Sequence, residues 1–167
     1  MDDPFWDWAS NNYKQVIIAF GNHEFYKGYD LSKLEDGFKY KIRDNIYYYY
    51  NCIITIDDID IIVSTLWSHI RKENEMNCSM SVNDFRLIKY GKETLTPEIF
   101  NKEHKKCLDF IKRVLNESKA KSNIIVTHHV PSILLTAKEF VGSDINNAFT
   151  VDLTDFIKNC GAKFWIF

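Results

Sequence analysis

The chain has 167 residues, of which 46% are hydrophobic and 26% charged, and its formal net charge is −2 at pH 7. This length corresponds to about one domain, which can bury roughly 70% of its unfolded surface, and the composition is that of a globular protein. The near-neutral charge does not favour a nucleic-acid partner, because phosphate-binding proteins concentrate Lys and Arg on one face.

Neither a membrane span nor an exported disulfide framework is expected. The longest apolar runs, such as residues 59–66, are far shorter than the roughly 20 residues that a transmembrane helix needs. The first residues lack the basic and then apolar order of a signal peptide, so we expect a cytoplasmic protein. The four cysteines show no C-x-x-C spacing, which argues against a zinc knuckle and against a disulfide framework.

The first half of the chain reads as one helix, a buried strand, a second helix and three close strands. The predicted ranges are a helix over 5–13, a strand over 16–20, a helix over 31–42, and strands over 46–50, 53–57 and 59–66. Residues 16–20 are apolar at every position, which predicts a central strand covered on both faces. The pair Asp57-Asp58 marks a tight turn between two of the later strands.

The second half contains one irregular stretch followed by a long helix. Residues 67–90 lack sustained periodicity and predict a long loop or a set of short turns, which in a compact domain is more often functional than idle. Thr96, Pro97 and Glu98 form a helix start signal, and the helix should run to about Lys119. A strand over 124–127, a helix over 151–160 stopped by Gly161, and a strand over 162–167 complete the prediction. No repeat or linker divides the chain, so we expect a single domain over 1–167.

Polar side chains follow two of the predicted buried strands. Gly21 ends the first strand and is followed by Asn22, His23 and Glu24, while His128 and His129 end the strand at 124–127. Turns after buried strands hold side chains stiffly, as a catalytic site needs. An amide oxygen and an imidazole nitrogen together suit Zn, Mn or Fe, and Glu24 would hydrogen-bond a neighbouring histidine and fix its tautomer. The alternative is a merely polar turn, but two such strand ends favour one shared site.

Three other residues have a functional and a structural interpretation. Arg86 would contact a substrate phosphate through its planar guanidinium, or would pair with Asp84 or Glu73 to fix the irregular segment. His69 is more readily a solvated loop histidine than a substrate contact. His104 is more readily a packing or surface histidine of the long helix.

The motifs at the strand ends resemble those of the calcineurin-like metallophosphoesterase family. Gly21-Asn22-His23-Glu24 and Thr127-His128-His129-Val130-Pro131 occur in the family's order, each after an apolar strand. The segments Thr65-Leu66-Trp67 and Val82-Asn83-Asp84-Phe85-Arg86 are similar to a bacterial-type subgroup. The resemblance spans almost the whole chain.

The resemblance implies an α/β fold, a phosphoesterase sandwich of mixed β-sheets flanked by helices, in a four-layered arrangement. It further implies two divalent ions (Mn, Fe or Zn) that activate a water for hydrolysis of a phosphomonoester or phosphodiester. By the same resemblance, Asn22 and His128 would ligate one ion, and His23 would face the leaving group as electrophile or general acid. His129 would have a supporting, structural or substrate-contacting role.

The sequence departs from the family pattern at both ends. The family's Asp-x-His, Gly-Asp and Gly-His-x-His motifs are not found, so we expect a central part of the domain that is incomplete at both ends. Only Asn22 and His128 match metal-ligating positions, and we therefore expect this chain alone to bind metal weakly and to hydrolyse little. The alternative to an enzyme is a non-catalytic phosphoesterase-like scaffold or a truncated remnant.

Overall fold

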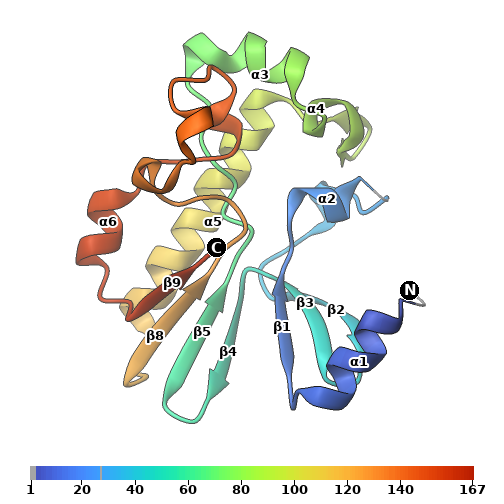
Figure 1. Cartoon of the computed structure of the whole chain (residues 1–167), viewed down its shortest axis with the longest axis vertical. Helices are drawn as coiled ribbons and strands as arrows, with labels where there is room; N and C mark the ends of the chain where they lie inside the picture. Colours follow the sequence, from blue (N-terminus) through green and yellow to red (C-terminus); the bar gives the residue numbers. More distant parts are fainter. Residues whose placement is uncertain (1–2, 27) are drawn as a thin grey trace.

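The structure is a computed structural model that describes residues 3–26 and 28–167, and it shows a mixed α/β fold (Figure 1). The helices are α1 (Pro4–Asn12), α2 (Asn22–Phe25), α3 (Glu75–Ser81), α4 (Asp84–Leu87), α5 (Pro97–Glu117) and α6 (Thr154–Asn159). The strands are β1 (Val16–Ala19), β2 (Phe38–Arg43), β3 (Ile46–Tyr50), β4 (Cys52–Ile56), β5 (Ile59–Val63), β6 (Lys89–Tyr90), β7 (Glu93–Thr94), β8 (Ser122–Val126) and β9 (Phe164–Ile166). Short 3₁₀ turns lie at Leu31–Lys33, Lys72–Asn74, Ile133–Leu135, Lys138–Phe140 and Asn146–Ala148.

The strands form two main sheets. One has the order β1-β3-β2, with β1 parallel and β2 antiparallel to β3. The other has the order β4-β5-β8-β9, in which β5, β8 and β9 run parallel and β4 is antiparallel to β5. β6 and β7 form a separate two-stranded ribbon. β1 and β8 belong to different sheets. The residues that follow these two strands can therefore meet only where the two sheets contact each other.

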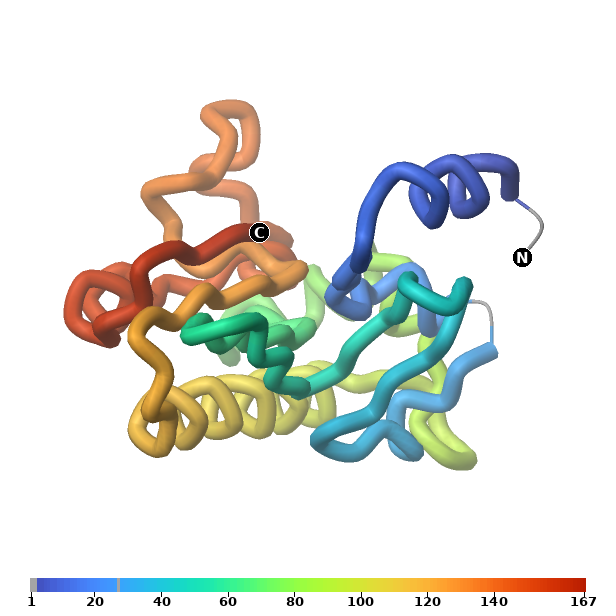
Figure 2. The backbone as a smooth tube through the Cα atoms, turned by 90° about the horizontal axis from the view of Figure 1, so that it is seen from below, coloured from blue at the N-terminus to red at the C-terminus, as the bar shows by residue number. Residues whose placement is uncertain are grey.

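Two large clusters of buried side chains form the hydrophobic core. Phe110, Ile111 and Val114 of α5 pack against Ile62 and Ile125 of the larger sheet. Figure 2 shows α5 running along the base of the molecule beneath this sheet. The largest cluster lies around Trp67 and joins the N-terminal sheet to α3, α4 and the first turns of α5. These aromatic-rich contacts fix the loops at the ends of the strands.

The two sheets contact each other through a third, smaller cluster. Tyr49, Cys52 and Val63 are buried there, and half-buried side chains of β1 and β8 pack around them. This contact places the carboxyl ends of β1 and β8 on the same side of the molecule.

Most predicted elements are confirmed. The helix after Thr96 runs over Pro97–Glu117, and the Thr96 side chain accepts a hydrogen bond from the Ile99 amide at 3.2 Å. Residues 67–90 contain the helices α3 and α4 and the strand β6, so the prediction of a long loop or a set of short turns is wrong for this segment. The buried or half-buried cysteines are all free, as expected.

Two further predictions are wrong. Residues 31–42 form a 3₁₀ turn followed by β2, because Gly37 adopts φ +90° and the next residues pair with β3. The prediction of a central strand covered on both faces is also wrong, because β1 is the edge strand of its sheet and is half-buried at every position. Within the described parts of the chain, no helix combines the length and the hydropathy required to cross a bilayer.

Candidate functional site

The site is built where the chain leaves β1 and β8. Gly21 follows β1 and begins the single turn of α2, in which Asn22 is buried and His23 exposed. Beyond β8, the backbone amides of His128 and His129 both donate to the Thr65 carbonyl at 3.3 Å, just past the end of β5. The sheet therefore fixes the backbone on both sides of the site.

Asn22 and His128 converge although 106 positions separate them in the chain. Asn22 Oδ1 lies 2.9 Å from His128 Nε2. Gly21 permits this approach, since a Cβ at that position would lie 2.8 Å from His128 Cε1 and 2.9 Å from Nδ1. Real carbon atoms do not pack that closely, so the glycine is required by the space that the imidazole occupies.

Asp84 of α4 orients the Asn22 amide. Its Oδ1 accepts a hydrogen bond from Asn22 Nδ2 at 2.8 Å and another from the Tyr26 hydroxyl. An ionised carboxylate accepts and does not donate, so the NH₂ group of Asn22 must face Asp84. The carbonyl oxygen of Asn22 is thereby directed at His128.

The protonation states follow from burial. His128 keeps part of its surface exposed, but the partial burial of its ring lowers its pKa, and the negative charge of Glu24 opposes this shift. Burial lowers the pKa of His129 to about 3, so this imidazole is neutral at pH 7. Burial and the bond to Asp84 raise the pKa of Tyr26, which keeps its hydroxyl as a donor. Neutral imidazoles retain a lone pair for a metal or a proton.

A cavity of about 560 Å³ opens over these groups. It is lined by Asn22, His23 and His128, and by Val130 and Phe149 from the chain after β8. The His23 ring lies with its centroid 4.7 Å from that of Tyr26. An exposed imidazole thus faces a cavity whose floor carries a neutral imidazole and an oriented amide oxygen.

Glu24 and Arg86 differ from expectation. Glu24 closes its own turn, since its Oε2 accepts from the Gly21 amide at 2.8 Å and its Oε1 from the Tyr48 hydroxyl at 3.5 Å. The predicted bond to a histidine is therefore wrong. Arg86 donates to Asn83 Oδ1 at 2.5 Å instead of pairing with Asp84 or Glu73.

The remaining histidines have distinct settings. His129 is 4% exposed and packs against the rings of Trp67 and Phe100, so its environment is that of a core residue. His104 is buried and its Nδ1 bonds the Trp67 carbonyl, whereas His69 is exposed. The packing interpretation of His104 and the solvated interpretation of His69 agree with the structure.

The sequence did not single out Asp84 or Tyr26 as site residues. Asp84 accepts from both Asn22 and Tyr26, and these two hydrogen bonds join residues 62 and 58 positions apart. Phe149 and Val130 were missed as well. Asp84 and Val130 lie within quoted motifs but were given no role in the site, and Tyr26 and Phe149 stand in no local pattern that signals one.

The donor set can be tested against a divalent ion. Two ligands at 2.0 to 2.1 Å from one ion and at right angles to each other lie about 3 Å apart, close to the separation of Asn22 Oδ1 and His128 Nε2. A site of four or more ligands needs further donors, and the described residues contain no group of three or more His, Cys, Asp or Glu able to hold a metal ion. Asn22 and His128 thus fit one edge of a metal site and do not complete it.

Comparisons with known proteins agree with the architecture. The family model of calcineurin-like phosphoesterases matches residues 4–167. The chain is similar to "Uncharacterized protein L509" of Acanthamoeba polyphaga mimivirus, with 34% identity over 170 residues that cover 92% of this chain and 60% of that protein. It therefore spans about 60% of that relative's length. No solved structure matches. With a family model covering nearly all of it, the chain belongs to the calcineurin-like phosphoesterase family.

Proposed function

We propose that this chain is part of a metal-dependent phosphoesterase whose substrate phosphate binds in the cavity over Asn22, His23 and His128. The observation that carries the proposal is the 2.9 Å contact between Asn22 Oδ1 and His128 Nε2 at the ends of strands from two sheets. In this structure the contact is a hydrogen bond that His128 Nε2–H donates to Asn22 Oδ1. The two atoms already lie at the separation of two ligands of one ion, so a divalent cation that replaces the shared proton would hold both of them.

His23 has the position of a proton donor. It is exposed at the cavity, next to His128 and apart from the bonds that hold Asn22. In the hydrolysis, a water oxygen bonds to phosphorus while the ester P–O bond breaks, and the leaving oxygen takes a proton from the protonated imidazole of His23. One proton of the attacking water stays on the phosphate and the other restores the proton of His23, so the products are the free alcohol and the remaining phosphate.

The metal requirement extends beyond this donor pair. Two ions of the Mn, Fe or Zn type are proposed from the family, and Asn22 and His128 would supply two of the ligands. A complete site needs further ligands besides this pair. The activity of the whole protein is therefore what the experiment must measure.

The test is an assay of the full-length protein with p-nitrophenyl phosphate and bis(p-nitrophenyl) phosphate, with and without Mn²⁺. We expect turnover that depends on Mn²⁺ and falls at least about 100-fold in Asn22→Ala and His23→Ala. His69→Ala is the matched control, because it removes an exposed histidine outside the cavity. The ratio of the two substrates separates monoesterase from diesterase activity.

Two results would contradict the proposal. Equal rates in wild type, Asn22→Ala and His23→Ala would remove the proposed roles of these residues. Absence of turnover with Mn²⁺, Fe²⁺ and Zn²⁺ would favour a non-catalytic scaffold that keeps the fold.

A further inference from the structure

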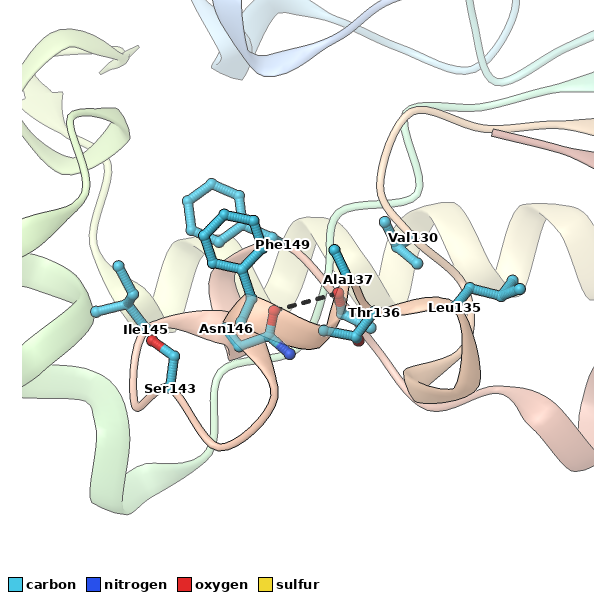
Figure 3. Close-up of a pocket in the computed structure, with 10 residues that line it drawn as sticks. Val130, Leu135, Thr136, Ala137, Ser143, Ile145, Asn146 and Phe149 are labelled. Atoms are coloured by element: carbon cyan, nitrogen blue, oxygen red, sulfur yellow. Dashed lines mark hydrogen bonds between the residues drawn. The ribbon is translucent and has the colours of Figure 1, made fainter.

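A second cavity lies beside the candidate site, enclosed by the loop of residues 130–151. The base of the loop is closed by hydrogen bonds from the Val130 amide to the Phe149 carbonyl at 3.1 Å and from the Val151 amide to the Val130 carbonyl at 3.0 Å. Three 3₁₀ turns shape the loop between these bonds. The cavity holds about 440 Å³, a volume typical of small-molecule pockets (Figure 3).

The lining of this cavity is apolar and uncharged. None of its ten lining residues carries a charge, and they include Leu135, Phe140, Ile145 and Phe149. The loop also exposes Ile133, Leu134 and Val141 to solvent. Single exposed apolar side chains are ordinary on a protein surface, but a cluster around a concavity indicates a binding site.

A few polar groups interrupt the apolar lining. The Thr136 hydroxyl oxygen is buried and has no hydrogen-bond partner within the described residues. Asn146 Oδ1 accepts only a long bond, 3.5 Å, from the Thr150 hydroxyl. Figure 3 shows Thr136 and Asn146 contributed by different turns of the same loop. A buried hydroxyl without a partner costs stability until something satisfies it, which a ligand heteroatom can do.

The two cavities share a wall. Val130 and Phe149 line the apolar cavity and also the cavity over Asn22 and His128. Val130 is only two residues from His128, and its backbone is bonded to that of Phe149. A ligand whose anionic end binds in the cavity over Asn22 and His128 can therefore place its neutral end in the apolar cavity, on the other side of Phe149.

We propose that the cavity in loop 130–151 binds an aromatic or heteroaromatic alcohol group of the phosphoester substrate. This inference rests on the proposed function, whose phosphate site supplies the other end of the same ligand. The absence of charge makes this cavity a poor site for the phosphate, and Phe140 and Phe149 are aromatic lining residues of the kind against which a planar ring packs. The few polar atoms suit one or two ring heteroatoms, whereas a sugar would lose most of its hydrogen bonds to water.

The test compares 2-(1-naphthyl)ethyl phosphate with ethyl phosphate, whose leaving alcohols are similar in acidity, using the full-length protein. Wild type is expected to favour the naphthyl ester by roughly tenfold or more in kcat/KM. Ala137→Trp fills the cavity from an exposed position, and Phe149→Ala removes the shared wall. Both should reduce the preference to about twofold or less. Leu134→Ala is the control, because Leu134 is an exposed apolar residue of the same loop that does not line this cavity.

A binding measurement separates this inference from the proposed function. Calorimetry with uncharged 1-naphthol should show binding to wild type and to Leu134→Ala, with at least tenfold weaker binding to Ala137→Trp. Naphthol binding without any turnover would support the cavity and contradict the proposed hydrolysis. Turnover with no naphthyl preference and no naphthol binding would overturn the cavity proposal alone.

Self-association is the competing explanation for the exposed apolar loop. Sedimentation of wild type, Ala137→Trp and Phe149→Ala measures it, and urea unfolding checks that both variants fold. A monomer in all three supports a ligand cavity. A wild-type dimer that the variants dissociate, together with no naphthol binding, would overturn the proposal in favour of a contact between two copies of the chain.

Discussion

The carboxylate of Asp84 determines which atom of Asn22 faces His128. It is 1% exposed, lies on α4, and holds Asn22 Nδ2 at 2.8 Å together with the Tyr26 hydroxyl. Its second oxygen, Oδ2, is buried and has no hydrogen-bond partner among the described residues. A buried carboxylate with so few partners is costly, which is consistent with a role in orienting the site rather than in stabilising the fold.

Replacing Asp84 should release the Asn22 amide. In Asp84→Ala we expect about a 10- to 100-fold loss of phosphoesterase activity in the full-length protein, as is typical when a residue that orients a metal ligand is removed. The free energy of unfolding should fall by about 1 to 3 kcal/mol, because Asn22 Nδ2 loses its acceptor in a buried setting. Side-chain amide resonances of Asn22 measure the reorientation directly.

Tyr26→Phe is the control for this prediction. It removes one bond to Asp84 and leaves the bond between Asp84 and Asn22 intact. Activity in Tyr26→Phe should stay within about threefold of wild type. Unchanged Asn22 resonances and unchanged activity in Asp84→Ala would show that Asp84 does not orient the amide.

The sequence predicts Asn22 and His128 as residues of the site, but not the residues that orient them. Asn22 and His128 follow apolar strands, so a local pattern marks them. Asp84 lies in a segment without periodicity, and Glu24 turns back to its own backbone because the Gly21 amide lies within reach at the start of α2. Side-chain hydrogen bonds between distant segments leave no such pattern.

At the scale of elements, α5 is the helix on which both main clusters of the core depend. Its buried face contributes Phe100 and Cys107 to one cluster and Phe110, Ile111 and Val114 to the other. Thr96 caps the start of this helix through its side-chain oxygen. Loss of the cap should therefore lower the free energy of unfolding of the whole domain.

Thr96→Ala should lower the free energy of unfolding by about 1 kcal/mol, since the Ile99 amide loses its acceptor. Urea unfolding followed by circular dichroism measures the change. Thr96→Ser keeps the hydroxyl and should stay within about 0.5 kcal/mol of wild type. Equal stability of the Ala and Ser variants would contradict a role for the cap.

β2 shows why an element can be mispredicted. Leu31, Leu34, Phe38 and Ile42 follow the three- and four-residue spacing of a helix. The chain nevertheless turns at Gly37 and pairs Phe38–Arg43 with β3, giving the smaller sheet its antiparallel edge. Tertiary pairing outweighs local spacing here, whereas α5 has both a cap and a continuous apolar face that agree.

At the scale of the molecule, the site lies between two sheets that share only a small buried cluster. Tyr49, Cys52 and Val63 are its buried members. The larger cores lie on the helix-covered side, around Trp67 and against α5. The distance between Asn22 and His128 therefore depends on how the two halves are held together.

The stability of the whole fold should depend on pH through His104. Burial lowers the pKa of His104 below its usual 6.5. Below about pH 6.5 His104 binds a proton in the unfolded chain but not in the folded chain. The contribution of His104 to the free energy of unfolding is therefore complete above this pH, and it is lost as the pH falls toward the lower pKa of the folded state. For this one group, the free energy of unfolding cannot change by more than about 1.4 kcal/mol per pH unit.

Urea unfolding at pH 7, 6 and 5 tests this. The free energy of unfolding of wild type should fall with decreasing pH, and His104→Gln should show a shallower dependence. His69→Gln alters an exposed neighbour whose charge contributes less than burial to the lowered pKa of His104, so it should change the pH dependence less than His104→Gln does. The same pH dependence in wild type and His104→Gln would contradict the prediction.

The central claim is that Asn22 and His128 are ligands of one divalent ion, and a titration of this chain with Mn²⁺ followed by NMR tests it most directly. Paramagnetic broadening detects weak binding, which is what a pair of donors allows. The account predicts that the side-chain amide of Asn22 and the imidazole of His128 broaden first, and that Asn22→Ala abolishes the effect at His128. Broadening centred on other residues, with these two groups unchanged, would contradict it.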